Sequence, residues 1–485
     1  MYYAIYNIVL VLILSGCLMS NNNNSKYDLN GIAKNHQKQN TETEMNSQWE
    51  GLNTELFKVY NVGNYSEGLE LAKTAYQFAK HNFGDSDKRT IISTNNLASL
   101  YKSNGMYSKA ESLYQRCLLL NEKTQGPEHP DTLKSINNLG GLYRDMGKFS
   151  KAEQLFKDCL KLREKVLGPE DPSTLISLNV LAELYRDLGK YSQALSHYNR
   201  CIMLREKILG PDHPSTLTSI NNLAFLYQSQ GRYSEAEPLH KRCLQLREKV
   251  LGPKHPHTLI SINNLASSYE AQGRYMEAEP LYKRCLQVRE KVLGPKHPET
   301  LTSINNLALL YQAQGRYGEA EPLYKRCLQL REKFLGPKHP DTLTSINNLA
   351  LLYQAQGRYA EAEPLYKRCF QLREEALGFK HPSTLTSINN LGLLYQSQGR
   401  YGEAESLYKR CLQLREEVLG SKHPETLTSI NNLALLYQAQ GRYGEAEPLY
   451  KRCFQLREEV LGSRYTNQYQ QSWFIISITG KVWRS

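Results

Sequence analysis

The chain has 485 residues, of which 40% are hydrophobic, and a formal net charge of +12. Nine of its ten cysteines, from Cys117 to Cys453, lie 42 residues apart, a regularity that argues against a disulfide framework or a zinc-binding pattern. Basic residues alternate with glutamate, as in residues 242–250, and mixed signs of this kind indicate a solvated helix face rather than a polyanion-binding surface.

The N-terminus, residues 1–17, resembles an export signal. A short apolar run from Ile8 to Leu14 is followed by Ser15, Gly16 and Cys17. This run is shorter than the roughly 20 residues that span a bilayer. Residues 14–17 resemble the lipobox of bacterial lipoproteins, although no Lys or Arg precedes the run. The resemblance implies lipidation of Cys17 and a membrane tether; export without lipidation, or neither, are the alternatives.

Residues 18–45 follow and are rich in Asn, Lys, Gln, Ser and Thr. Such a segment has too few apolar residues to offset the entropy lost when it becomes ordered. We therefore expect a flexible polar tether between the N-terminal segment and the folded part of the chain.

From residue 46 onward the sequence repeats itself every 42 residues. One unit runs from Pro214 to His255, and ten such units fill residues 46–465, the first two being degenerate. A period of 20–50 residues is typical of a solenoid. Residues 466–485 form a C-terminal tail whose structure the repeat pattern does not predict. The other clear units begin at the prolines 130, 172, 256, 298, 340, 382 and 424.

Each unit contains two helical patterns. In the first, apolar residues between 220 and 227 recur at helical spacing, and Gly231 ends the helix. In the second, Ser234 and Glu237 predict a capping box at the start of the helix. The Leu-Gly-Pro sequence at 251–253 ends it. The unit is therefore a helix-turn-helix.

The order of residues within the unit resembles the tetratricopeptide repeat. The 42-residue length, the NNLA sequence of the first helix and the LREKVLGPKHP ending are similar to the repeats of kinesin light chains. The resemblance implies an all-α fold, a right-handed α-solenoid of about ten tandem repeats. A cargo-adaptor role would need the heptads that precede the repeats in kinesin light chains, and residues 1–45 contain none. The matching positions are Leu223, Ala224, Tyr227, Ala236, His240 (where most units have Tyr) and Cys243.

The spacing of the repeated cysteines and histidines indicates that they have structural rather than catalytic or metal-binding roles. In the tetratricopeptide pattern Cys243 and its counterparts occupy a small-residue position between helices, too far from one another for disulfides. One histidine per unit, such as His297, precedes the opening proline, and a single histidine per repeat cannot assemble a zinc site. The sequence contains no phosphate-binding loop, HExxH pair or nucleophile elbow. We therefore expect no catalytic residue, no metal and no cofactor.

The first helix of each unit carries the strongest candidate for a binding site. At 100° per residue, two consecutive Asn and one apolar residue lie opposite the buried stripe, and the family resemblance places that side in the concave groove. The Asn side chain can donate and accept hydrogen bonds at the same time, so it can pair with both the N–H and the C=O groups of a peptide backbone. The alternative is that Asn and Leu pack between adjacent first helices. The candidate groove residues are Asn221, Asn222, Phe225, Asn263, Asn264, Asn305, Asn306, Leu309, Asn347, Asn348, Leu351, Asn389, Asn390, Leu393, Asn431, Asn432 and Leu435.

These observations predict a non-catalytic scaffold that binds a protein or peptide segment in its concave groove. A second hypothesis is a structural or nucleic-acid-binding scaffold, which would use basic pairs on the convex second helices. Stacking recognition of nucleic acid would need aromatic residues beside those pairs, and none faces the same way. The pairs are Lys241-Arg242, Lys283-Arg284 and Lys325-Arg326.

Overall fold

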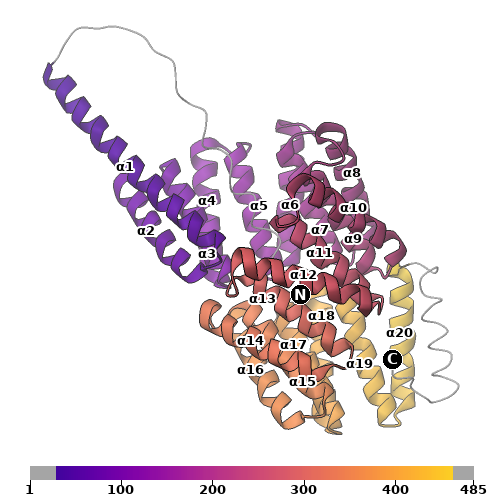
Figure 1. The fold of residues 1–485 in the computed structure, drawn as a ribbon. Coiled ribbons are helices and arrows are strands. Elements are labelled where there is room, and N and C mark those ends of the chain that lie inside the picture. Colours follow the sequence, from indigo (N-terminus) through magenta and orange to yellow (C-terminus); the bar gives the residue numbers. More distant parts are fainter. Residues whose placement is uncertain (1–28, 462–485) are drawn as a thin grey trace.

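The computed structural model describes residues 29–461, and these residues form twenty α-helices in antiparallel pairs. The first helices of the pairs are α1 (Leu29–Asn61), α3 (Lys88–Ser103), α5 (Pro130–Asp145), α7 (Pro172–Asp187), α9 (Pro214–Ser229), α11 (Pro256–Ala271), α13 (Pro298–Ala313), α15 (Pro340–Ala355), α17 (Pro382–Ser397) and α19 (Pro424–Ala439). The second helices are α2 (Tyr65–Phe83), α4 (Tyr107–Gln125), α6 (Phe149–Val166), α8 (Tyr191–Leu209), α10 (Tyr233–Leu251), α12 (Tyr275–Leu293), α14 (Tyr317–Leu335), α16 (Tyr359–Leu377), α18 (Tyr401–Leu419) and α20 (Tyr443–Leu461). The predicted all-α solenoid is confirmed, since each helix packs on the next in the chain (Figure 1).

The N-terminal part of this solenoid corrects one prediction. Helix α1 already begins at Leu29, so residues 29–45 are helical where a flexible tether was expected. Cys17, the rest of residues 1–28 and the tail after Leu461 lie outside the described residues. None of the helices between residues 29 and 461 is long and apolar enough to cross a membrane.

Local sequence signals fix most helix ends. Eight first helices begin at the predicted prolines, preceded by a His or Asp that accepts a hydrogen bond from the backbone two residues on, as His213 does from Ser215 at 3.1 Å. The predicted capping box at Ser234 is wrong, because α10 already begins at Tyr233. In the turn between α9 and α10, Gly231 adopts a φ of 71°, and the Arg232 N–H donates to the Tyr227 carbonyl at 2.9 Å. The second helix therefore begins directly after this turn.

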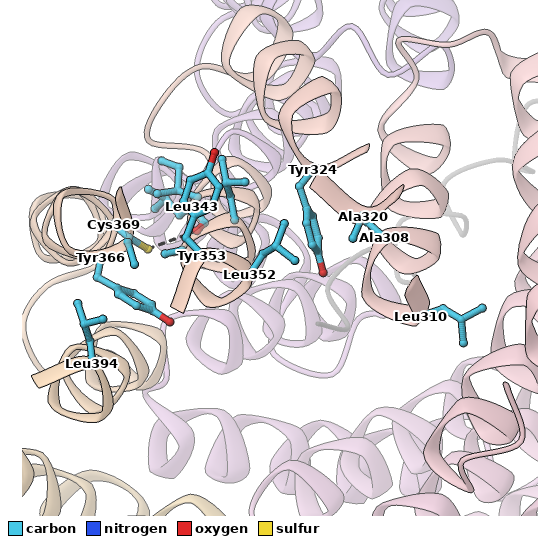
Figure 2. Packing of buried hydrophobic residues seen from close by; sticks show 14 of the residues in the cluster. Ala308, Leu310, Ala320, Tyr324, Leu343, Leu352, Tyr353, Tyr366, Cys369 and Leu394 are labelled. Atoms are coloured by element: carbon cyan, nitrogen blue, oxygen red, sulfur yellow. Dashed lines mark hydrogen bonds between the residues drawn. The ribbon is translucent and has the colours of Figure 1, made fainter. Parts of the chain in front are cut away.

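The hydrophobic core runs along the whole solenoid between paired helices. Figure 2 shows Tyr324 and Ala320 of α14 beside Ala308 of α13. Cys369 is buried and donates to the Leu343 carbonyl at 3.3 Å. The nine repeat cysteines are buried and free, as expected, and burial raises the pKa of the Cys243 thiol to about 11.

Buried arginines tie seven of the second helices, from α6 to α18, to the next first helix. Arg247 is 2% exposed, and its guanidinium donates to the His257 carbonyl at 3.1 Å and to Ser261 Oγ at 2.9 Å. The interpretation of residues 242–250 as a fully solvated face is therefore wrong at this position. The buried cation is tolerated because both terminal nitrogens of the guanidinium find partners, although Nε has none among the described residues.

His240 lacks a hydrogen bond that recurs in every later repeat of this core. In α14, Tyr324 Oη donates to Gln312 Oε1 of α13 at 3.0 Å. Among the described residues, neither ring nitrogen of the fully buried His240 has a partner, nor does Oε1 of Gln228. Burial lowers the pKa of His240 to about 4, so the ring is neutral.

We therefore expect His240→Tyr to stabilise the protein. The new hydroxyl would reach Gln228 as Tyr324 reaches Gln312, which is worth roughly 0.5–1.5 kcal/mol. Chemical denaturation of the full chain measures this gain. The reverse change, Tyr324→His, should destabilise by a similar amount; equal stability of all three proteins would contradict the expectation.

The solenoid coils so tightly that its second turn rests on its first. His339 Nε2 donates to the Ser103 carbonyl at 2.7 Å, a contact between residues 236 apart, or about 5.6 repeats of 42 residues. The same contact joins the starts of α13, α15, α17 and α19 to the ends of α1, α3, α5 and α7. We call these four contacts the inter-turn seam: His297 to Asn61, His339 to Ser103, His381 to Asp145 and His423 to Asp187.

The seam should open in acid. In each seam histidine Nδ1 accepts a backbone N–H and Nε2–H donates across the seam, so only the neutral ring fits. Burial lowers the pKa of His339, as it does for the other three, so their stabilising contribution is present at neutral pH and is lost as the pH falls below about 6.5. Small-angle scattering at pH 8 and pH 5 should show expansion. Replacing the four histidines by Asn, which caps helices without titrating, should abolish that pH dependence.

Candidate functional site

The paired asparagines of the first helices form a ladder between repeats. The second Asn of one repeat donates from Nδ2 to Oδ1 of the first Asn in the preceding repeat, always 43 residues earlier. In the central rungs Asn348 reaches Asn305 at 3.0 Å, and Asn390 reaches Asn347 at 2.8 Å. We call this set the asparagine ladder; its rungs are 53–96, 95–138, 179–222, 221–264, 263–306, 305–348, 347–390 and 389–432.

The ladder corrects where the candidate Asn side chains were expected to lie. They were placed outside the core, but the structure buries nearly all of them; Asn305 is 2% exposed and Asn348 4%. Angular positions around a single helix do not show the neighbouring first helices, which lie on both sides of every first helix except the terminal α1 and α19. The alternative, packing between adjacent first helices, describes these side chains better. The buried members are Asn221, Asn222, Asn264, Asn305, Asn306, Asn347, Asn348, Asn389, Asn390 and Asn432, while Asn263 and Asn431 are half-buried.

One rung is replaced by a charged cluster. Val180 stands where an Asn would donate, and Oδ1 of Asn137 is buried without a partner among the described residues. In the same repeat Glu183, which is 2% exposed, accepts from Asn222 at 2.9 Å and from Arg144 at 3.0 Å. Two departures from the repeat in this one helix are the sequence signal for the cluster: Val180 replaces the second Asn, and Glu183 replaces the apolar residue found as Phe225 and Leu309 in later units.

The apolar row differs from the ladder because it is only half-buried. Leu309, Leu351 and Leu393 pack on the edge of the main core cluster and keep part of their surface exposed. Phe225 and Leu435 are also half-buried, and the Arg186 guanidinium lies 4.9 Å from the centre of the Phe225 ring. The structure therefore leaves a row of apolar surface next to a rigid polar ladder.

The basic pairs of the second helices are neutralised. Lys325 bridges Glu321 at 2.7 Å, and Arg326 bridges Glu290 of the preceding repeat at 2.9 Å. Hydrogen bonds from Arg358 and from Lys325 lower the pKa of Glu321 to about 2. The pairs 241–242 and 283–284 are bridged to glutamates in the same way. This pairing weakens the hypothesis of a nucleic-acid-binding convex face. Between residues 29 and 461, no three His, Cys, Asp or Glu side chains gather closely enough to hold a metal ion.

Comparison with protein families gives one clear match. The tetratricopeptide repeat model matches eight times, over residues 89–165, 138–207, 173–249, 215–273, 257–333, 303–375, 342–417 and 383–459. Among curated proteins, none matches.

Several solved structures are similar in part. A putative kinesin light chain from Podosopora anserina with nearly identical tetratricopeptide-like repeats is 34% identical over 42% of this chain and 97% of that one, with a TM-score of 0.36. BtubC (BKLC) from P. vanneervenii is 23% identical over 48% of this chain and 91% of that one, with a TM-score of 0.37. A Rap protein complexed with competence and sporulation factor is 12% identical over 77% and 99%, with a TM-score of 0.52, a likeness of fold alone.

Proposed function

The chain belongs to the tetratricopeptide repeat family, with repeats like those of kinesin light chains, and from this we propose that it is a non-catalytic protein-interaction scaffold. Members of this family generally hold other proteins. The finer part of the proposal is that a peptide segment lies along the first helices, with apolar side chains on the row formed by Phe225, Leu309, Leu351, Leu393 and Leu435.

The half-buried apolar row is the observation that carries this proposal. Its leucines recur every 42 residues on consecutive first helices, and residues 300–314 contain no charged side chain. Regularly spaced apolar surface of this kind marks interaction sites. The asparagine ladder supports the row by fixing the spacing of the first helices, so little order would have to be created on binding. The Asn side chains thus act as positioning groups, and the leucines as the contacts.

Peptides selected on the immobilised full chain test the proposal. Each Leu→Ala change at 351 or 393 should weaken the selected peptide by about tenfold, which corresponds to about 1.4 kcal/mol. Lys325→Glu with Arg326→Glu on the second helix is the matched control and should leave affinity within about twofold. Circular dichroism checks that each variant is folded. Loss of binding in the control variant, with both leucine variants unaffected, would favour the convex face instead.

Salt dependence separates the remaining alternative. Nucleic-acid binding by the basic pairs would weaken steeply as salt rises, whereas apolar anchoring would not.

A membrane tether through Cys17 stays a prediction, and retention of the wild type but not of Cys17→Ser in the membrane fraction would support it. A cargo-adaptor role like that of kinesin light chains rests on the resemblance of the repeats alone.

A further inference from the structure

A recurring salt bridge joins the turn between repeats to the second helix of the following repeat. Its two positions lie 37 residues apart. In the first turn of the superhelix the turn residue is acidic: Glu170 bridges Lys207 at 2.5 Å. In the second turn the signs are exchanged: Lys338 bridges Glu375 at 3.0 Å. The five bridges are Glu128–Lys165, Glu170–Lys207, Lys338–Glu375, Lys380–Glu417 and Lys422–Glu459.

Between the regions of opposite sign, two consecutive repeats place a lysine at both positions. In the first of these repeats the turn residue is Lys254 and the helix residue is Lys291; in the second they are Lys296 and Lys333. These four lysines, which we call the lysine quartet, lie in the turns after α10 and α12 and in helices α12 and α14. All four are exposed, and none forms a salt bridge within the described residues.

The quartet therefore places like charges where five other repeats place an ion pair. The carboxylates next to these lysines in the sequence are already engaged: Glu248 bridges Arg284 and Glu290 bridges Arg326. One aromatic ring offsets part of the repulsion, because Phe334 lies 5.0 Å from Lys296 Nζ and 5.6 Å from Lys333 Nζ. Most other repeats have an aliphatic residue at this position, as in Val250 and Val292.

We propose that the lysine quartet is a docking site for an acidic protein segment. Where the pair is complete, a glutamate of the chain itself sits against the lysine at 2.5–3.0 Å, so these positions are already shaped for a carboxylate. A partner that supplies one carboxylate to each lysine pair would complete both missing bridges. Its acidic residues would need to span one repeat, about the 10 Å between packed helices. The site lies at the turns between repeats, apart from the apolar row, and does not depend on peptide binding there.

The tests use the full chain and a fluorescently labelled peptide of ten glutamates, read by anisotropy at low salt. Lys291→Glu with Lys333→Glu restores the ion pairs seen in the other repeats, so the fold should be retained. Binding should fall by about tenfold or more, because four unpaired cations become two internal pairs. Wild-type binding should also weaken with added salt. Unchanged binding in this double variant would overturn the proposal.

The second turn of the superhelix offers a matched gain-of-binding variant. Glu375→Lys with Glu417→Lys creates two like-charged pairs, Lys338 with residue 375 and Lys380 with residue 417, in consecutive repeats. This variant should bind the glutamate peptide more tightly than wild type, and failure to do so would count against the geometry proposed. Inorganic polyphosphate is the comparison ligand. If polyphosphate binds the quartet and the glutamate peptide does not, the assignment to carboxylates is wrong.

Discussion

Replacing Gly63 and Gly147 by alanine should separate the two turns of the superhelix. A Cβ at Gly147 would lie 2.4 Å from Cδ of Pro382, and one at Gly63 would lie 2.2 Å from Cδ of Pro298, so the second turn must move away. Both glycines also have left-handed φ values, of 68° and 72°, which cost an alanine roughly 1–2 kcal/mol each. We expect lower thermal stability together with a larger radius of gyration by small-angle scattering.

The solenoid contains its own control for this experiment. Gly315 and Gly357 occupy the same position in later repeats with φ values of 73° and 72°, but no described atom lies within 4 Å of an added Cβ. Alanine there should cost the same backbone strain and leave the radius of gyration unchanged. Expansion in both double variants would show that local strain, and not contact between turns, holds the superhelix closed.

Replacing Asn347 by alanine should destabilise the central repeats by about 1–3 kcal/mol. The change removes the acceptor of Asn390 Nδ2, which lies 2.8 Å away, and leaves a buried donor unsatisfied. Adding Asn390→Ala should cost less than the sum of the single changes, because the unsatisfied group disappears with it. Denaturant titration of the single and double variants measures this coupling.

Asn431 gives the matched control for the ladder. It is half-buried in α19 and makes no rung with any described residue, because the repeats end before the position 43 residues later. Asn431→Ala should therefore change the free energy of unfolding by less than about 0.5 kcal/mol. If Asn347→Ala were equally harmless, the ladder would contribute nothing to stability, and its side chains would be available for a bound peptide after all.

The candidate site could be predicted only in part from the sequence. The apolar row at Leu309, Leu351 and Leu393 follows from helical spacing alone, and the structure leaves it half-buried. The Asn residues lie on the same side of the helix, yet all of the candidates except Asn431 pair with an Asn 43 residues away in an adjacent repeat. A wheel drawn for one helix contains no information about such neighbours. The charge pairs 37 residues apart were missed for the same reason.

The sequence by itself determined the 42-residue unit, its two helices and the ends of most of them, because proline, glycine and apolar spacing act within a few residues. It also determined the burial of Cys243 and its counterparts, since a small residue recurring at one position of an amphipathic helix must face a neighbour. Only the tertiary structure decided that Arg247 is buried and that the second turn rests on the first. Contacts such as His339 with Ser103 depend on small rotations that accumulate over several repeats. No short stretch of sequence contains the total rotation over several repeats. The contact between the two turns, the inter-turn seam and the exposed surfaces are therefore set only when the repeats are stacked.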